Sequence, residues 1–224
     1  NFDFIRENGL FFEQNISSCD QTGTSLATIF TGKYPMNSGV TQFNFNFEFV
    51  TFFDNLRELG YSLYSYVNDM SIFEKITENF DKNTTFVYGG TTTYPHLDDG
   101  IGDDIIKNFL DKKMNEPWLL YSHLMDLKDP LVWLKEFDDV KFGETDYDRN
   151  LSILDKWIGK FLEKINLENT LFVITTDHGE YVKPQSNDLE KSIRRVSNIG
   201  KKSQILGSIG KKPFAFSLKI AKKM

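Results

Sequence analysis

Segments with the apolar pattern of strands alternate with segments of helical periodicity over the first 180 residues of this 224-residue chain. The helical pattern of residues 51–59 ends at Gly60, for example, and a buried-strand pattern follows at once over residues 61–67. Alternation of this kind favours an α/β fold with a mostly parallel sheet flanked by helices. The expected strands are 10–15, 61–67, 85–88, 117–123 and 171–176, and the expected helices are 2–8, 25–32, 51–59, 98–114 and 147–165.

Composition and charge divide the chain into two regions. A hydrophobic fraction of 40% with 21 Phe is enough for the core of one ordinary domain. No apolar run approaches the ~20 residues that span a bilayer, and the single cysteine, Cys19, excludes an internal disulfide. Residues 183–224 carry 11 Lys and Arg against 2 Asp and Glu, whereas residues 1–182 carry 15 against 30. We therefore expect an α/β domain over residues 1–182 and a separate basic segment over residues 183–224.

The excess of positive charge in residues 183–224 can be explained with or without a binding partner. A solvated segment, or the start of a truncated region, is the simpler explanation, and nucleic acid, anionic lipid or an acidic protein are the alternative partners. The segment shows neither aromatic interleaving nor a recognisable nucleic-acid module, so we expect no nucleic acid, whereas membrane contact stays open.

The most informative run for function is Asp177-His178-Gly179-Glu180, which directly follows the predicted strand 171–176. Sheets of α/β proteins present their chemistry at the carboxyl ends of their strands. Asp177 and His178 offer an oxygen and a nitrogen donor to a divalent cation, and Gly179 lets the chain turn away from the site. A capped strand end with a chance Asp–His pair is the alternative.

A second candidate site is the loop and helix start that contains Thr22, Thr24 and Ser25. Hydroxyls just ahead of a helix lie where backbone N–H groups and the helix dipole favour an anion. A metal-bound Thr could also attack sulfur or phosphorus. Helix capping by Thr24 or Ser25 is the simpler explanation of the local sequence.

A third candidate site follows the predicted strand 117–123. His123, Asp126 and Lys128 are spaced by two or three residues, so that they can converge on one anionic group. A chance polar loop explains the same spacing equally well.

In this order the segments resemble the sulfatase family of the alkaline phosphatase superfamily, over about residues 1 to 180. The resemblance implies an alkaline-phosphatase-like fold, and its strength comes from several motifs in sequence. These motifs are Asn1-Phe-Asp3 with Gly9-Leu-Phe-Phe12, Thr22-Gly-Thr-Ser-Leu-Ala-Thr-Ile-Phe-Thr31-Gly-Lys-Tyr-Pro35, Leu56-Arg-Glu-Leu-Gly60-Tyr61, Pro117 to Pro130, Tyr147 to Asp155, and Thr170 to Glu180.

The resemblance places the nucleophile at Thr22. Classical sulfatases have a Cys at this position that is converted to formylglycine, whereas a Thr is familiar in relatives that cleave or transfer phosphate esters. Cys19 lies three residues too early for this role. The family usually has Arg or His four residues after the nucleophile, where this chain has Leu26.

The same comparison assigns the metal and anion positions. Asp177 and His178 match the metal-binding pair, to which the Thr22 hydroxyl is added as a ligand. The second histidine of the central loop is replaced by Lys128, which can hold an anion as a point charge. The acidic ligands of the family's first strand fall upstream of Asn1, so we expect either a fragment or a degenerate site.

The resemblance therefore implies a metal-dependent hydrolase of sulfate or phosphate esters, a sulfuric ester hydrolase in the first instance. Ca²⁺ is the expected metal, with Mn²⁺ or Zn²⁺ for a phosphoester-specific enzyme, and the expected partner is a small-molecule or glycan sulfate or phosphate ester. Two alternatives are a phosphodiesterase or phosphoryl-group transferase of the same superfamily, and a non-catalytic relative that binds an anion or glycan. The expected site comprises Thr22, His123 and Lys128 for catalysis, Lys128, Thr24 and Ser25 for substrate binding, and Asp177, His178 and Thr22 for the metal.

Overall fold

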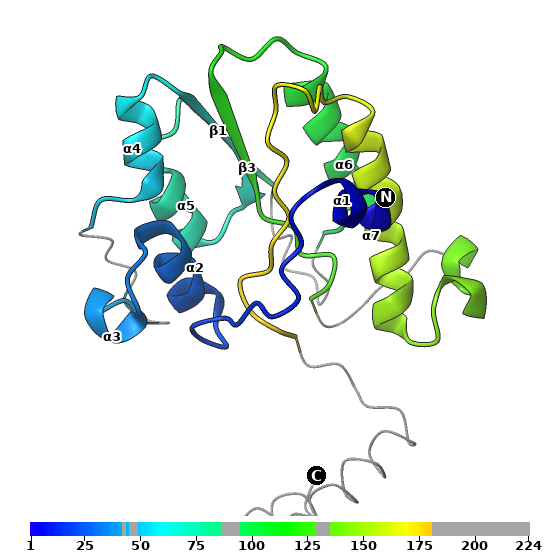
Figure 1. The fold of residues 1–224 in the computed structure, drawn as a ribbon. Helices are drawn as coiled ribbons and strands as arrows, with labels where there is room; N and C mark the ends of the chain where they lie inside the picture. Colours follow the sequence, from blue (N-terminus) through cyan, green and yellow to red (C-terminus); the bar gives the residue numbers. More distant parts are fainter. Residues whose placement is uncertain (42–43, 45–48, 87–94, 129–134, 181–224) are drawn as a thin grey trace, which may run out of the picture. The chain divides into compact units, whose positions relative to one another are not determined.

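A small parallel sheet lies at the centre of the molecule. The computed structural model describes residues 1–41, 44, 49–86, 95–128 and 135–180, and residues 1–180 form one compact unit. Within these residues the sheet has the order β2-β1-β3, with both outer strands parallel to the middle one (Figure 1). The strands are β1 (Ser62–Asn68), β2 (Lys82–Phe86) and β3 (Trp118–Ser122). The predicted α/β class, with a parallel sheet flanked by helices, is confirmed.

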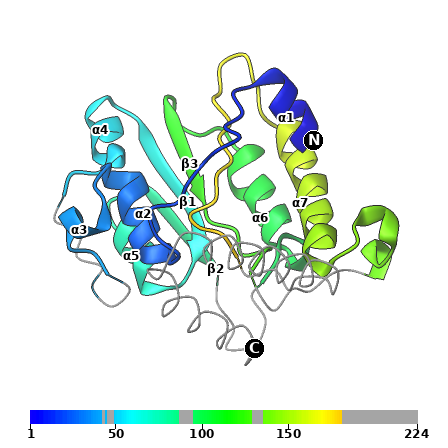
Figure 2. The same ribbon diagram turned by 60° about the horizontal axis from the view of Figure 1, so that its bottom comes forward.

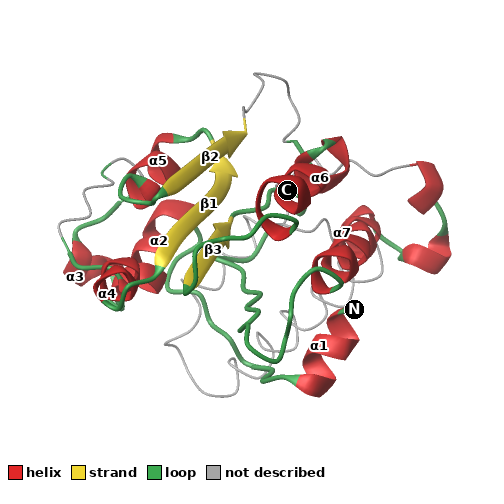
Figure 3. Cartoon of the chain, turned by 90° about the horizontal axis from the view of Figure 1, so that it is seen from above, coloured by secondary structure: helices red, strands yellow, loops and turns green. Residues whose placement is uncertain are grey.

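Helices cover both faces of the sheet, as the view from above shows (Figure 3). Successive residues of a strand point to opposite faces, so Tyr66 and Val67 of β1 belong to two different apolar clusters. One face carries α2 (Thr22–Thr31), α3 (Pro35–Ser38), α4 (Phe52–Glu58) and α5 (Ser71–Thr77); the other carries η1 (Leu97–Asp99), α6 (Ile101–Ile105), the π-helical turn η2 (Ile106–Leu110) and α7 (Asp146–Leu162).

The cluster between the sheet and α6 and α7 is organised around Trp157, which is 2% exposed. Its indole Nε1 donates to Asp98 Oδ1 at 2.9 Å. A Cβ atom on Gly102 would overlap the Trp157 ring, so a glycine is needed where α6 and α7 approach each other.

Two of the helices begin at capping boxes that the sequence contains. Thr51 accepts from the backbone N–H of Asp54 at the start of α4, and Thr145 accepts from that of Asp148 at the start of α7. In each case the aspartate accepts in return from the backbone N–H of the threonine. These caps explain why the helices begin close to the predicted residues 51 and 147.

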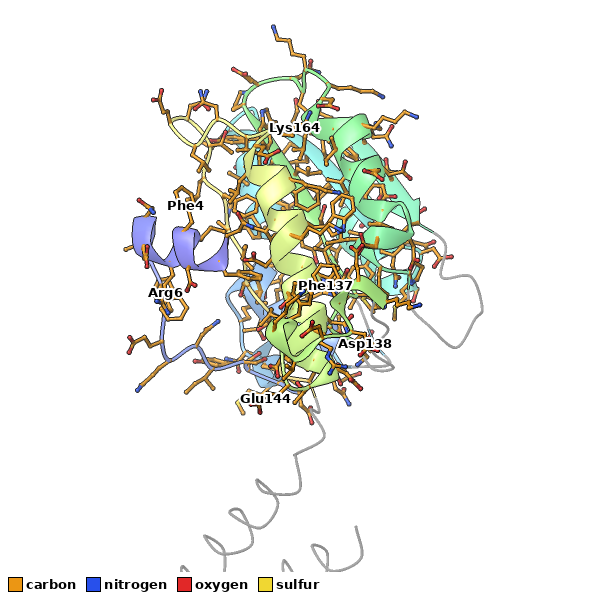
Figure 4. The ribbon with its side chains drawn as sticks, turned by 90° about the vertical axis from the view of Figure 1, so that its right-hand side faces the viewer. Phe4, Arg6, Phe137, Asp138, Glu144 and Lys164 are labelled. Carbon is orange, nitrogen blue, oxygen red and sulfur yellow. The ribbon has the colours of Figure 1, made fainter. Side chains whose placement is uncertain are left out.

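The helix α1 (Phe2–Asn8) packs against α7 through one carboxylate. Asp155 Oδ1 accepts from the backbone N–H of Phe2 at 2.7 Å and lies 3.0 Å from the backbone nitrogen of Asn1. Figure 4 looks onto α7, with the short turns η3 (Lys135–Phe137) and η4 (Val140–Phe142) beside its first residues. Asp138, labelled there, forms an ion pair with Arg149 at 2.9 Å. Among the described helices, none is both long and apolar enough to cross a membrane.

Two predicted strands are wrong within the described residues. Segments 10–15 and 171–176 are extended but have no regular secondary structure, and their apolar side chains are largely exposed, with Leu10 at 91% and Leu171 at 88%. The segments run toward the start of α2 (Figure 2), where the Ser17 hydroxyl lies 2.6 Å from the carbonyl oxygen of Asp177. An apolar extended sequence becomes a strand only where a neighbour pairs with its backbone, and the described part of the chain offers these two segments no such neighbour.

The predicted helix 98–114 is also divided. A 3-10 turn, a short α-helix and a π turn replace it, with Gly100 at φ +100° between the first two. The positive φ is accessible to glycine and breaks helical continuity at that residue. The predicted basic segment 183–224 lies outside the described residues.

Candidate active site

Two predicted site segments that are far apart in the sequence meet at the start of α2. The Thr22 Oγ1 atom lies 3.1 Å from His178 Nε2, although 156 residues separate them. Thr22 is the first residue of α2, and the helix has no side-chain cap. The Thr22 hydroxyl is therefore not used to begin the helix and is directed to the histidine instead.

The hydrogen bonds of His178 define which ring nitrogen carries the proton. Its Nδ1 lies 2.8 Å from the carbonyl oxygen of Gly179. A carbonyl oxygen only accepts, so Nδ1 carries the proton, and in the neutral ring Nε2 presents a lone pair. The Thr22 hydroxyl consequently donates to Nε2. A lone pair on this nitrogen is what both a general base and a metal ligand require.

The carboxylate of Asp177 lies against the same nitrogen. Asp177 Oδ2 is 3.5 Å from His178 Nε2, and it is buried without a hydrogen-bond partner among the described residues. A buried oxygen without a hydrogen-bond donor costs free energy. The lone pair of His178 Nε2 beside it adds to this cost, because two acceptors repel each other. In a catalytic triad the acid contacts the other ring nitrogen of the histidine. The arrangement therefore differs from a triad and fits a cation better.

These three side chains carry donor atoms of the kinds that bind divalent metals. Thr22 Oγ1 and Asp177 Oδ2 lie 3.1 and 3.5 Å from His178 Nε2, and oxygen and nitrogen donors of this kind bind Ca²⁺, Mn²⁺ or Zn²⁺. A complete site takes about four or more ligands. Within the residues that the structure describes, no group of three or more His, Cys, Asp and Glu side chains is placed to hold a metal ion. The remaining ligands would have to come from other groups.

The third predicted segment joins the site through His123, which directly follows β3. Burial lowers the pKa of His123, with the negative charge of Asp177 opposing this shift and His178 adding to it. Asp177 also raises the pKa of Tyr121, where burial is the larger cause. His123 and Tyr121 are therefore close to the Asp177–His178 corner, and their side chains contact each other, with Tyr121 Oη 3.2 Å from His123 Nδ1.

Lys128 contacts Glu180, the last residue of the Asp177–Glu180 run. The Lys128 Nζ atom lies 3.0 Å from Glu180 Oε2, and both side chains are only partly exposed. Glu180, together with burial and Asp148, raises the pKa of Tyr147, with burial as the largest cause. The lysine that the sequence placed in the anion site is thus positioned by the last residue of the Asp-His-Gly-Glu run. The predicted loop residues 129 and 130 lie outside the described residues.

Asp126, between His123 and Lys128, anchors this segment to η1. It is 3% exposed, and its Oδ1 accepts from the backbone N–H of Leu97 at 3.0 Å. Burial, partly offset by backbone hydrogen bonds and reinforced by Asp98 and Asp99, raises the pKa of Asp126 to about 7.

Thr24 and Ser25 are not brought to the surface of the site. Both lie inside α2 at 6% and 1% exposure, so the explanation that they cap the helix is wrong, because the N-cap residue is Gln21. The Ser25 hydroxyl donates to the carbonyl oxygen of Cys19 at 2.9 Å, which ties the preceding loop to the helix. Their contact with a substrate stays a prediction. Leu26, where the family usually has Arg or His, is buried in the core against the sheet.

Two contributions to the site were missed by the sequence analysis. The position of Tyr121 could have been inferred from the sequence. Side chains two residues apart on an extended strand point to the same face, and Tyr121 lies two residues before His123. Ser17 has no comparable signal. Its hydroxyl joins the loop before α2 to the backbone of Asp177, which depends on tertiary structure alone.

Comparisons with known proteins identify the family of the chain. The sulfatase family matches the chain over residues 1–204, which extends beyond the predicted boundary at residue 182. An uncharacterized protein of Haemophilus influenzae is 34% identical over 82 residues, which cover 34% of this chain and 12% of that protein. This chain thus spans only about an eighth of that relative's length. No solved structure matches the chain. Because the family match covers most of its residues, the chain belongs to the sulfatase family.

Proposed function

We propose that this protein is a metal-dependent hydrolase of sulfate or phosphate esters with Thr22 as its nucleophile. Family membership supports ester hydrolysis in general. The single observation that carries the finer proposal is the convergence of Thr22 Oγ1 and the buried, unpartnered Asp177 Oδ2 on His178 Nε2. A hydroxyl that donates to a metal-type ligand and does not cap its helix supports a role as nucleophile.

Asp177, His178 and Thr22 are the residues that would hold the metal. A bound divalent cation lowers the pKa of a coordinated hydroxyl and polarises the ester. The chain's own residues supply the rest. Thr22 Oγ1 loses its proton to solvent and forms a bond to sulfur or phosphorus while the bond to the leaving alcohol oxygen breaks. The leaving oxygen takes a proton from Lys128, and water then hydrolyses the Thr22 ester. In this structure the Thr22 hydroxyl donates to His178 Nε2, which keeps Oγ1 and Nε2 3.1 Å apart, a separation that two ligands of one cation can have.

Lys128 and His123 would act on the anion and on the leaving oxygen. The Lys128 ammonium offers positive charge and can give a proton to the departing oxygen. His123, whose pKa is lowered by burial, is neutral near pH 7 and donates one N–H hydrogen bond. Both groups are preorganised, since Glu180 holds the lysine and Tyr121 contacts the imidazole. Preorganised donors of this kind stabilise charge that develops in the transition state.

A panel of three esters tests the reaction class. The full-length protein, treated with a chelator and then resupplied with Ca²⁺, Mn²⁺ or Zn²⁺, is assayed on p-nitrophenyl sulfate, p-nitrophenyl phosphate and bis(p-nitrophenyl) phosphate. We expect turnover of a monoester that is lost on chelation and restored by one of the metals. Turnover of the diester alone would assign a phosphodiesterase or transferase instead. No turnover of any of the three esters, together with no metal binding by calorimetry, would favour a non-catalytic anion-binding protein.

The proposed anion-binding role of Lys128 predicts a change in KM. Lys128→Ala removes the positive charge beside the site, so KM for a monoester should rise by about tenfold or more. Glu180→Gln breaks a partly exposed ion pair, which is worth at most about 1 kcal/mol, and should change KM by a few-fold at most. Steady-state kinetics on both variants separate anion binding by Lys128 from the positioning of Lys128 by Glu180.

The matched control is Lys75→Ala, which removes a lysine from a comparable ion pair with Glu78 at 2.8 Å on α5. Its KM should equal that of the wild type. A KM for Lys128→Ala that also equals the wild-type value would remove Lys128 from the anion site.

A further inference from the structure

The side chains of Tyr121 and His123 form a pair whose geometry decides where the imidazole proton lies. The Tyr121 hydroxyl is 3.2 Å from His123 Nδ1. Tyr121 is in β3 and His123 directly follows it, so the pair is built into the end of a central strand. The backbone N–H of His123 also lies 3.4 Å from the carbonyl oxygen of Tyr66 in β1, which continues the strand pairing to this residue.

The protonation states of the two side chains limit the hydrogen bond to two forms. Burial and the charge of Asp177 raise the pKa of Tyr121 well above its usual value, so the phenol keeps its proton. An imidazole with an ordinary pKa of about 6.5 is neutral near pH 7.5 and carries one proton. Either the phenol donates to Nδ1, or Nδ1–H donates to the phenol oxygen.

The surroundings of the phenol favour the first form. If Nδ1–H donated, the Tyr121 proton would need another acceptor, and among the described residues His123 Nδ1 is its one hydrogen-bond partner. The ring is enclosed instead by apolar groups, with the Phe30 ring 5.4 Å away edge-on and the Phe53 ring 5.9 Å away. Tyr121 is half-buried, and a hydroxyl proton left there without an acceptor in the protein costs free energy. The hydroxyl therefore donates to Nδ1, and the imidazole proton is left on Nε2.

We propose that Tyr121 fixes His123 in the tautomer that carries its proton on Nε2. Tyr121 is then a positioning residue, and the N–H that His123 offers to an anion or leaving oxygen is the one on Nε2. Only this consequence for catalysis rests on the proposed ester hydrolase function; the tautomer itself does not. The arrangement is the reverse of that at His178, where a carbonyl oxygen holds the proton on Nδ1. One imidazole of the site thus presents a lone pair and the other a donor.

Packing of both rings makes the hydroxyl testable by itself. The His123 ring lies 4.5 Å from the ring of Phe73 on α5, and Tyr121 is packed in the same apolar cluster. Tyr121→Phe keeps the ring and its aromatic neighbours and removes only the oxygen. The imidazole should stay in place but lose the group that selects its tautomer.

The test is the two-bond ¹H–¹⁵N correlation spectrum of the full-length protein with ¹⁵N-labelled histidine near pH 7.5. The chain has only three histidines, and the His123 signals are assigned by their loss in His123→Gln. We expect the wild type to show Nε2–H for His123, and Tyr121→Phe to show a mixture of both tautomers. His96 is the internal reference, because its side chain accepts from the backbone N–H of Asp99 and should be unaffected.

Tyr66→Phe is the matched control, since it removes a hydroxyl that donates to Asp104 at 3.2 Å in the cluster on the other face of the sheet. It should leave the His123 tautomer unchanged. A wild-type spectrum with Nδ1–H for His123 would overturn the proposal, as would an unaltered tautomer in Tyr121→Phe. Failure of the ester assays would leave this spectrum unaffected, so the two proposals fail separately. Where turnover is measured, kcat of Tyr121→Phe should fall roughly 10- to 100-fold, as when other partners that orient a functional imidazole are removed.

Discussion

Thr22→Ala should abolish ester hydrolysis, with a loss of kcat of at least about a thousandfold. The substitution removes the one hydroxyl that lies 3.1 Å from His178 Nε2, and with it both the attacking oxygen and a ligand of the proposed metal site. Thr22→Ser keeps an oxygen at this place and should retain activity to within roughly tenfold. Initial rates on the best ester of the panel, measured with the metal that supports turnover, give both numbers.

The Thr22→Ala substitution should leave the stability of the fold unchanged. Thr22 provides no side-chain cap to α2, and alanine is a better helix former than threonine, so unfolding in urea should be unaltered within error. Thr28→Ala is the matched control on the same helix, because its hydroxyl donates only to the carbonyl oxygen of Thr24 one turn earlier. Full activity in Thr22→Ala would show that another group attacks, and the proposed mechanism would be wrong.

The fold class could be predicted because it depends on local signals that survive in a single sequence. The strand over residues 62–68 follows a glycine-terminated helix, and the capping threonines at 51 and 145 begin helices near the predicted places. Segments 10–15 and 171–176 have the same apolar character as β1 and are nevertheless not strands. Whether an apolar extended segment joins a sheet depends on a partner elsewhere in the chain, which local sequence does not contain.

The candidate site was predictable as a set of segments but not as a geometry. The order of the motifs brought Thr22, His123, Lys128 and the Asp177–His178 pair into one hypothesis, and their placement near one another is consistent with it. The orientation of each ring follows from contacts with a carbonyl oxygen and a phenol, which depend on tertiary packing. The burial of individual side chains also depends on tertiary packing. The sequence marks Ser25 and Asp126 only as polar, whereas the structure encloses both, and this changes what each can do.

Asp126→Asn should make the protein more stable at neutral pH, by an amount that depends on pH. The carboxyl group has its pKa raised from 3.8 to about 7 in the folded state, chiefly by burial and also by Asp98 and Asp99. Between pH 4 and 7 the folded protein therefore keeps a proton that the unfolded chain has lost, and the free energy of unfolding falls as pH rises through this window. At 1.36 kcal/mol per pKa unit the total cost is on the order of 4 kcal/mol.

Asparagine removes the ionisation but keeps an oxygen that can accept from the backbone N–H of Leu97, as Asp126 does at 3.0 Å. Urea unfolding of wild type and variant at intervals from pH 4 to 8 measures the effect. The variant's advantage in free energy of unfolding should grow by about 1.4 kcal/mol per pH unit up to pH 7 and then level off. A constant offset across the range would mean that Asp126 titrates alike in the folded and unfolded states.

Asp155→Asn is a control for which we expect the opposite pH dependence of the free energy of unfolding. Burial raises the pKa of Asp155, but hydrogen bonds from Phe2 and Asn1 outweigh it, so the pKa is lowered overall. Its carboxylate thus stabilises the fold above the unfolded pKa, and this contribution is lost as pH falls through the folded value. Asp155→Asn should be less stable than the wild type at neutral pH and should approach it only under more acidic conditions. Opposite slopes in the two variants would tie each pH dependence to its own carboxyl group, because a general effect of charge removal would give both the same sign.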